Sequence, residues 1–164
     1  MKKILYIFSL IFLSSCGFYS FTGASISPDV KTFSVKYFPN KAATINASLS
    51  SVFTEKLKEH FSRQTNLEQI DNEGDLMFEG EITSYSIKPM AISANETARQ
   101  NRLTIKIKVK FTNKTDEKLN FNTTFSRYKD FPADEDLSNV EESYMEEICE
   151  ELVEDIFNKS VVNW

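Results

Sequence analysis

The sequence is poor in the residue types that carry most enzymatic chemistry. Its 164 residues include one histidine, two cysteines, four glycines and four prolines. His60 has no second histidine and no Cys-x-x-Cys motif to form a metal site with it, and a lone histidine at the edge of an apolar stripe is usually a boundary residue. Neither G-x-S-x-G nor a phosphate-binding glycine loop is present. We therefore expect no enzyme: no catalytic residue, no metal and no bound cofactor.

The sequence also lacks a hydrophobic run long enough to span a membrane. Ile4–Leu13 is apolar over about ten residues, half of the roughly 20 that a transmembrane helix requires. It follows Lys2 and Lys3 and precedes two small residues, which is the arrangement of a signal peptide. Residues 1–15 are thus predicted to be a leader that is removed.

The end of this leader carries a more specific motif. Leu13-Ser14-Ser15-Cys16 resembles the bacterial lipobox, which implies that Cys16 carries covalent diacylglycerol and an N-acyl lipid, the only non-protein groups that we expect. Two or three acyl chains would anchor the protein stably in a membrane. The alternative is an ordinary secretory signal with a chance cysteine. A lipid on Cys16 leaves Cys149 without an intramolecular disulfide partner.

Net charge and length limit the remaining classes. Of 19 Lys and Arg residues two lie in the leader, so the mature chain has 17 basic and 24 acidic side chains and a net charge of −7. This balance predicts no nucleic-acid partner. Residues 16–30 are aromatic but rich in small and turn-forming residues and read as a lipidated tether. Residues 31–164 suffice for a single domain.

The first half of that domain predicts a strand, a helix and a second strand. Alternation places Phe33, Val35 and Tyr37 on one face of the first strand. Residues 43–64 then predict a helix, capped by Asn46 or Thr44, with an apolar stripe of Leu49, Val52, Phe53, Leu57 and Phe61. In the second strand, residues 76–87, the alternation changes phase near Thr83 and Ser84, which indicates a β-bulge.

The second half predicts two more strands and a helix. Residues 90–100 form a long connection of the kind that is often functional. Residues 103–111 alternate strictly, with Lys106, Lys108 and Lys110 on the face opposite the apolar one. A polar turn over 113–118 leads to an antiparallel strand over 119–125.

The last segment predicts an amphipathic acidic helix. Ser138-x-x-Glu141 has the form of a capping box. The apolar stripe behind it includes Cys149, whose thiol is expected to be inert. The rest of the surface is acidic: Glu141, Glu142, Glu146, Glu147, Glu150, Glu151, Glu154 and Asp155.

Together the elements predict an α+β fold in the order β-α-β-β-β-α. Each strand has one apolar face and each helix one apolar stripe, so both helices should pack on one face of a four-stranded sheet. The helix between the first two strands allows a parallel crossover there and hence a mixed sheet. The fold is then a two-layer sandwich whose other face carries the three lysines.

Several fragments, in this order, resemble one family. They are Cys16-Gly17-Phe18-Tyr19-Ser20, Gly74-Asp75-Leu76, Glu79-Gly80-Glu81-Ile82-Thr83, Asn101-Arg102-Leu103-Thr104-Ile105, Phe125-Ser126-Arg127-Tyr128 and Asp155-Ile156-Phe157-Asn158-Lys159. The chain resembles LptE, the lipopolysaccharide-assembly lipoprotein, in the form typical of Bacteroidota. The resemblance implies a lipid-anchored domain that plugs the LptD β-barrel of the outer membrane and assists the assembly of lipopolysaccharide at the cell surface.

The resemblance also suggests partners and contact residues. An LptD-like barrel is the expected partner, and lipopolysaccharide is a second candidate. From charge and position, the candidate contact residues are Arg99, Arg102, Lys106, Lys108 and Lys110. Gly17 follows Cys16 without the acidic run that resembles a surface-export signal, which predicts the periplasmic side of the outer membrane. The alternative function is a periplasmic lipid carrier or adaptor with its own lipid-binding cavity.

Overall fold

The protein is described by a computed structural model over residues 26–90 and 99–162. The leader, Cys16 and most of the tether 16–30 lie outside the described residues, as does most of the connection 90–100. The elements are β1 (Thr32–Val35), α2 (Leu49–Gln64), β2 (Glu68–Gln69), β3 (Leu76–Pro89), β4 (Gln100–Asn113), the 3-10 helix η2 (Glu117–Leu119), β5 (Phe121–Pro132) and α3 (Leu137–Val161).

The strands form one mixed sheet in the order β2-β1-β3-β4-β5. β1 runs parallel to both β2 and β3, whereas β3, β4 and β5 are antiparallel neighbours. The mixed sheet and the parallel crossover are thus confirmed. The sheet has five strands rather than four because Glu68 and Gln69 pair with the free edge of β1; a two-residue, fully exposed strand has no alternation for a sequence pattern to detect.

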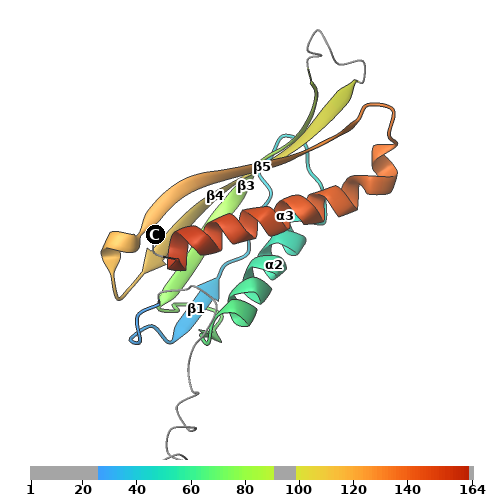
Figure 1. Ribbon diagram of the computed structural model, residues 1–164. Coiled ribbons are helices and arrows are strands. Elements are labelled where there is room, and N and C mark those ends of the chain that lie inside the picture. The colour runs from blue at the N-terminus through green and yellow to red at the C-terminus, as the bar shows by residue number, and fades with distance from the viewer. Residues whose placement is uncertain (1–25, 91–98, 163–164) are drawn as a thin grey trace, which may run out of the picture.

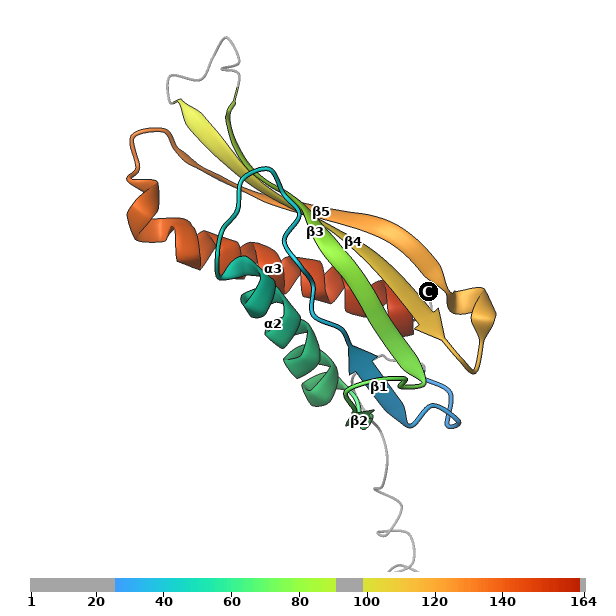
Figure 2. The same ribbon diagram turned by 180° about the vertical axis from the view of Figure 1, so that it is seen from behind.

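Both helices lie on the same side of the sheet, as Figures 1 and 2 show from opposite directions. α3 runs diagonally along β4 and β5, and α2 lies beside it over β1. The two-layer α+β sandwich is therefore confirmed. In the described part of the chain no helix covers the other side of the sheet, which we call the open face.

Phenylalanine rings fill the space between the layers. Phe61 of α2 lies 4.6 Å from Phe78 of β3 between ring centroids, Phe78 lies 5.0 Å from Phe111 of β4, and Phe111 lies 5.2 Å from Phe121 of β5. Such aromatic pairs contribute about 0.5–1.5 kcal/mol each beyond their buried area. This row of rings joins three strands and a helix into one core.

The end of β1 differs from the prediction. Tyr37 is 61% exposed, while its neighbour Phe38 is fully buried. The strand ends at Val35, and beyond it the Phe38 amide donates a hydrogen bond to Thr54 Oγ1 of α2. Because this segment leaves the pleated geometry, alternation no longer decides which side chain is buried.

The start of β1 is held by Asp75, just before β3. Its Oδ2 accepts hydrogen bonds from the backbone amides of Lys31 (2.8 Å) and Thr32 (2.9 Å) and from Thr32 Oγ1 (3.0 Å). The backbone bond from Lys31, and then that from Thr32, hold the pKa of Asp75 below its usual value. One carboxylate therefore fixes where the N-terminal strand begins.

The N-termini of the two helices are capped by different kinds of side chain. α2 begins at Leu49, and Asn46 Oδ1 accepts hydrogen bonds from the amides of Ser48 and Leu49, both 3.1 Å long, so Asn46 acts as expected. The capping box at α3 is wrong: Asp136 is the N-cap and accepts from the Ser138 amide. Ser138 already lies inside the first turn, which frees Glu141 for other contacts.

The bulge in β3 is confirmed, since its register against β4 shifts between Ile82 and Ser84. β5 extends to Pro132, well beyond the predicted end at residue 125. Arg127 and Lys129 occupy positions of β5 that face α3, so the apolar alternation stops although the strand continues.

Candidate functional site: the open face of the sheet

Cross-strand pairing arranges the polar side chains of the open face in rows. Lys110 of β4 lies between Glu79 and Asn122, Lys108 between Glu81 and Thr124, and Lys106 between Ser84 and Ser126. The three lysines, Asn122, Thr124 and Ser126 are exposed. The open face thus has a central row of cations flanked by carboxylates on one side and by hydroxyl and amide groups on the other.

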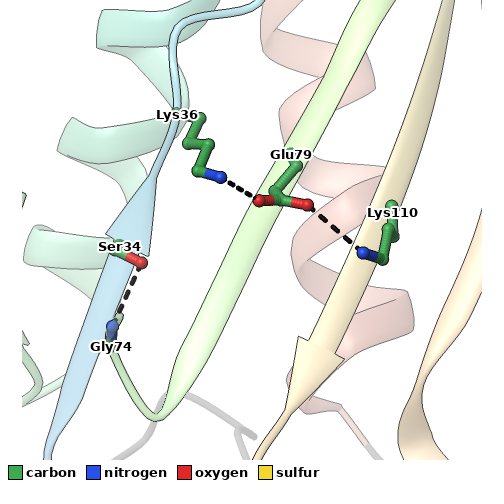
Figure 3. A network of polar contacts seen from close by, with 5 residues as sticks. All are labelled: Ser34, Lys36, Gly74, Glu79 and Lys110. Carbon is green, nitrogen blue, oxygen red and sulfur yellow. Dashed lines mark hydrogen bonds and ion pairs between the residues drawn. The ribbon is translucent and has the colours of Figure 1, made fainter. Parts of the chain in front are cut away.

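Glu79 neutralises one end of this row. Figure 3 shows its carboxylate between Lys36, which follows β1, and Lys110. The Lys110 Nζ to Glu79 Oε2 distance is 3.3 Å, and the contact with Lys36 is closer. The hydrogen bond from Lys36, and then that from Lys110, lower the pKa of Glu79 below its usual value. The ammonium group of Lys110 is therefore already ion-paired within the chain.

Lys106 and Lys108 remain without such a partner. Within residues 26–90 and 99–162, neither ammonium group has a carboxylate within 4.0 Å. Lys108 faces Glu81 across the strand pair without closing an ion pair, and Lys106 faces only serines. Two adjacent outward positions of one strand thus present exposed, unpaired positive charge.

The far end of the open face carries a closed cluster. Arg102 donates two hydrogen bonds to Asp130, from Nε to Oδ1 (2.6 Å) and from Nη2 to Oδ2 (2.7 Å). Its guanidinium also lies 3.6 Å from the centroid of the Tyr128 ring. The bond from Arg102 lowers the pKa of Asp130. A bidentate, stacked arginine is held in place, so its charge is satisfied internally.

The fifth predicted contact residue, Arg99, lies at the same end. Its side chain is exposed, and its carbonyl accepts a hydrogen bond from the Ala133 amide (2.9 Å). Of the five candidates, the structure therefore brings Lys106, Lys108 and Lys110 together on one strand. Arg99 and Arg102 lie together at its end.

Several carboxylates of the acidic helix α3 form ion pairs that its sequence alone does not indicate. Arg127 of β5 forms a bidentate pair with Asp155 (2.5 and 2.6 Å), and Lys129 contacts Glu147 (2.5 Å). Lys56 of α2 donates to Glu150 (2.8 Å). These basic residues were missed because their partners lie on other elements; the loss of apolar alternation at Arg127 and Lys129 was the available signal.

One further carboxylate of α3 joins three segments. The Tyr85 hydroxyl of β3 and the Asn46 side-chain amide both donate to Glu141 Oε1. Burial, and then the hydrogen bond to Glu141, raise the pKa of Tyr85 above its usual value. The hydroxyl donates to a carboxylate in a site packed by the core, which is a structural role.

Two further titratable groups, Cys149 and His60, lie at or near the core. Cys149 is buried, and desolvation raises the pKa of its thiol to about 12. His60 is half-buried with its ring 4.8 Å from that of Phe157, and burial lowers its pKa. Among the described residues no group of three or more His, Cys, Asp or Glu side chains could hold a metal ion.

Surface hollows lie on both sides of the sheet. On the open face, one of about 350 Å³ adjoins Lys36 and Glu79, and one of about 250 Å³ is lined by Glu81, Lys108 and Lys110. Three more lie on the helical side and at the N-terminal end of the domain. One of about 500 Å³ between α2 and α3 is lined mostly by charged side chains, including Lys56, Arg63, Glu150 and Glu154. Two others, of about 360 and 300 Å³, lie around Pro28. All three are open to solvent. No described helix is both long and apolar enough to cross a membrane.

Comparisons with solved structures identify the fold. A minor lipoprotein from Acinetobacter baumannii matches with a TM-score of 0.53 at 11% identity, covering 79% of this chain and 91% of that one. Lipoprotein B from Nitrosomonas europaea matches with a TM-score of 0.50 at 11% identity, covering 86% of each chain. A Xanthomonas campestris protein matches with a TM-score of 0.53 at 6% identity, covering 85% and 90%.

The sequence itself gives the family. No curated protein sequence matches the chain. The LptE family, described as lipopolysaccharide-assembly, matches residues 30–160, which include every helix and strand of the fold up to the last turn of α3. LptE is a family of lipoproteins and not of enzymes. The chain therefore belongs to the LptE family of lipopolysaccharide-assembly lipoproteins.

Proposed function

We propose that this chain is an outer-membrane lipoprotein that partners and plugs an LptD-like β-barrel and thereby assists the assembly of lipopolysaccharide at the cell surface. The observation that carries the proposal is the family match over residues 30–160. The geometry supports it, because a domain that sits in the polar lumen of a barrel needs a solid core and polar outer faces.

The packing argues against the alternative of a lipid carrier. A carrier needs an enclosed apolar pocket for acyl chains. Here the row of phenylalanine rings occupies the space between sheet and helices, and the hollow between α2 and α3 is open and lined mostly by charged groups. A filled core with polar surfaces suits a plug.

The proposed anchor lies at Cys16 on the periplasmic side of the outer membrane. Nine residues lie between it and Ile26, the first described residue, and the ten residue steps span at most about 35 Å when fully extended. Such a tether would let the domain reach a barrel in the same membrane while the lipid stays in the leaflet.

Affinity purification tests the partnership. The full-length tagged protein is extracted from outer membranes in mild detergent, and co-purifying proteins are identified by mass spectrometry. We expect a large β-barrel protein in near-equal amount. Recovery of the folded lipoprotein without any large β-barrel would contradict the proposal.

Metabolic labelling tests the anchor separately. Labelled fatty acid should enter the wild-type protein and be absent from Cys16→Ala. Ser20→Ala, a change outside the lipobox that keeps the cysteine, serves as the control for expression and export. Equal labelling of Cys16→Ala and wild type would show that the lipid is not on Cys16.

A further inference from the structure

The open face carries an excess of positive charge on a chain that is negative overall. Strands β3, β4 and β5 place five cations there, Lys88, Arg102, Lys106, Lys108 and Lys110, against three carboxylates, Glu79, Glu81 and Asp130. The whole sequence has a formal net charge of −5. The molecule therefore has a positively charged face on the sheet layer, and its acidic helix α3 lies on the other layer (Figure 1).

We propose that the open face of β3, β4 and β5, centred on Lys106 and Lys108, docks against a carboxylate-bearing stretch of the barrel wall. This inference rests on the proposed function and deepens it, since it specifies which of the two faces of the domain meets the partner and what chemistry the partner presents there.

Three of the five cations, Lys88, Lys106 and Lys108, are exposed without an ion pair among the described residues, and of these only Lys106 and Lys108 stand next to each other on one strand. Lys110 is neutralised by Glu79, and Arg102 is held by Asp130 and Tyr128. Lys106 and Lys108 are exposed and have no ion pair in the described ranges. Complementary charge on a partner favours fast and correctly oriented association, and unpaired rim cations are the groups that such a partner can use.

The neighbours of the two lysines suit a protein wall. Thr124 and Ser126 of β5 stand beside Lys108 and Lys106 and can both donate and accept hydrogen bonds. The lysines lie two positions apart on one strand, about 7 Å, and point the same way from the sheet. Donors with this repeat match side chains spaced two positions apart along a partner strand.

The size of the open face fits a partial interface. Three strands over the 12 residues of β5 give a surface of roughly 40 by 14 Å, or about 560 Å². A standard interface buries about 800 Å² on each partner. The face can therefore supply most of one contact, with the remainder coming from the ends of the domain.

A second copy of this chain is a less fitting occupant. Its acidic helix could meet the open face, but that contact joins two different surfaces. A head-to-tail contact of this kind forms closed rings only at special angles and otherwise continues into filaments. A barrel wall that meets the face once has no such difficulty.

Site-specific photocrosslinking in cells, in the full-length lipoprotein, tests the proposal. A photoreactive amino acid replaces Thr124 or Ser126 on the open face, and Ser62 of α2 or Ser143 of α3 as exposed control positions on the helical layer. We expect crosslinks to the barrel protein from Thr124 and Ser126. Crosslinks from these positions mainly to lipopolysaccharide or to a second copy would overturn the inference.

Charge reversal provides the second arm. Lys106→Glu with Lys108→Glu should lower the amount of co-purified barrel by at least about tenfold, because like charges then face each other. The matched control, Lys58→Glu with Lys118→Glu, changes net charge equally on α2 and η2 and should retain recovery within about twofold. Thermal unfolding by circular dichroism verifies that both variants are folded.

The outcomes separate the two proposals. A barrel that co-purifies with wild type but crosslinks only from Ser62 and Ser143, and tolerates Lys106→Glu with Lys108→Glu, overturns the docking face and leaves the proposed function standing. Absence of any barrel from the wild-type purification overturns both.

Discussion

The side chains on the two faces of β4 differ in burial and in how far they are paired with the rest of the chain. Its inner residues, from Leu103 to Phe111, are at most 1% exposed, while Lys106, Lys108 and Lys110 between them are exposed. The side chains of the inner face are packed among α3, β3 and β5, whereas two of the three outer lysines have no ion pair among the described residues. Along this one strand, alternate residues therefore belong to the buried core and to the exposed face.

The charges of the two layers differ in the same way. On the helical side, Lys129 and Arg127 of β5 and Lys56 of α2 each hold a carboxylate of α3, so those charges link elements of the fold. On the open side, Lys106 and Lys108 form no ion pair with another described residue. Substitutions on the helical side should therefore affect unfolding more than partner binding, and substitutions on the open side should do the opposite.

The largest expected effect is on the inner face, at Phe78. Phe78→Ala removes a fully buried ring that contacts Phe61 and Phe111 and should lower the free energy of unfolding by about 3–5 kcal/mol. Guanidinium unfolding of the mature protein in mild detergent, followed by circular dichroism, measures the loss. A loss below about 1 kcal/mol would show that the aromatic row is not the centre of the core.

Gly80 should rank second, although it adjoins the open face. A Cβ at this position would lie 2.0 Å from the Lys108 carbonyl oxygen and 2.6 Å from the Phe38 ring. Gly80→Ala must shift either the β4 backbone or a fully buried ring, at a cost of about 1–3 kcal/mol. Glu81→Ala is the matched control with an expected change below about 0.5 kcal/mol, and equal unfolding midpoints for the two variants would refute the steric argument.

Tyr85 should show a smaller, pH-dependent effect. Tyr85→Phe leaves Glu141 without one donor and should cost about 1–2 kcal/mol at neutral pH. Since the folded-state pKa of Tyr85 is raised, its contribution is present below the unfolded pKa of about 10 and is lost as pH rises through the folded pKa. Unfolding curves between pH 8 and pH 11, values chosen to bracket about 10, should show a steeper alkaline decline for wild type than for Tyr85→Phe; parallel declines would contradict this assignment.

The smallest stability effect belongs to the open face. Lys106→Ala and Lys108→Ala should each change the free energy of unfolding by less than about 0.5 kcal/mol, because they remove an exposed side chain that makes no hydrogen bond or ion pair within the described chain. Lys129→Ala, which breaks a pair with Glu147, is the comparison from the other side of the sheet. A loss of more than about 1 kcal/mol at Lys106 or Lys108 would break the contrast between the faces.

Structural features that depend on neighbouring residues could mostly be predicted from the sequence. Features that depend on a residue elsewhere in the chain could not. The strict alternation over residues 103–111, the bulge near Thr83 and the capping role of Asn46 are local patterns, and all were predicted correctly. Tyr37 and the end of β5 were predicted wrongly because a partner elsewhere in the chain decided the outcome: Thr54 for the segment after β1, and α3 for Arg127 and Lys129. The start of α3 was wrong for a local reason, because Asp136, two residues before Ser138, is the N-cap.

The candidate site shows the same division. That Lys106, Lys108 and Lys110 share a face followed from their spacing. That only two of them are unpaired did not, because Glu79 of β3 pairs with Lys110 and is shared with Lys36 from the segment after β1. Likewise, nothing in the sequence around Arg102 indicates Asp130, which lies directly across the strand pair.

The carboxylate that fixes the beginning of β1 has a mechanical consequence. Any pull on the residues before Ile26 enters the domain along the chain through Val30 to Lys31 and Thr32, where the hydrogen bonds to Asp75 are the first long-range bonds to bear the force. Beyond them, β1 is bonded on both sides, to β2 and to β3. A tethered domain under tension would thus first load the hydrogen bonds at Asp75, and the force would then pass to the ladder bonds of β1 with both of its neighbours.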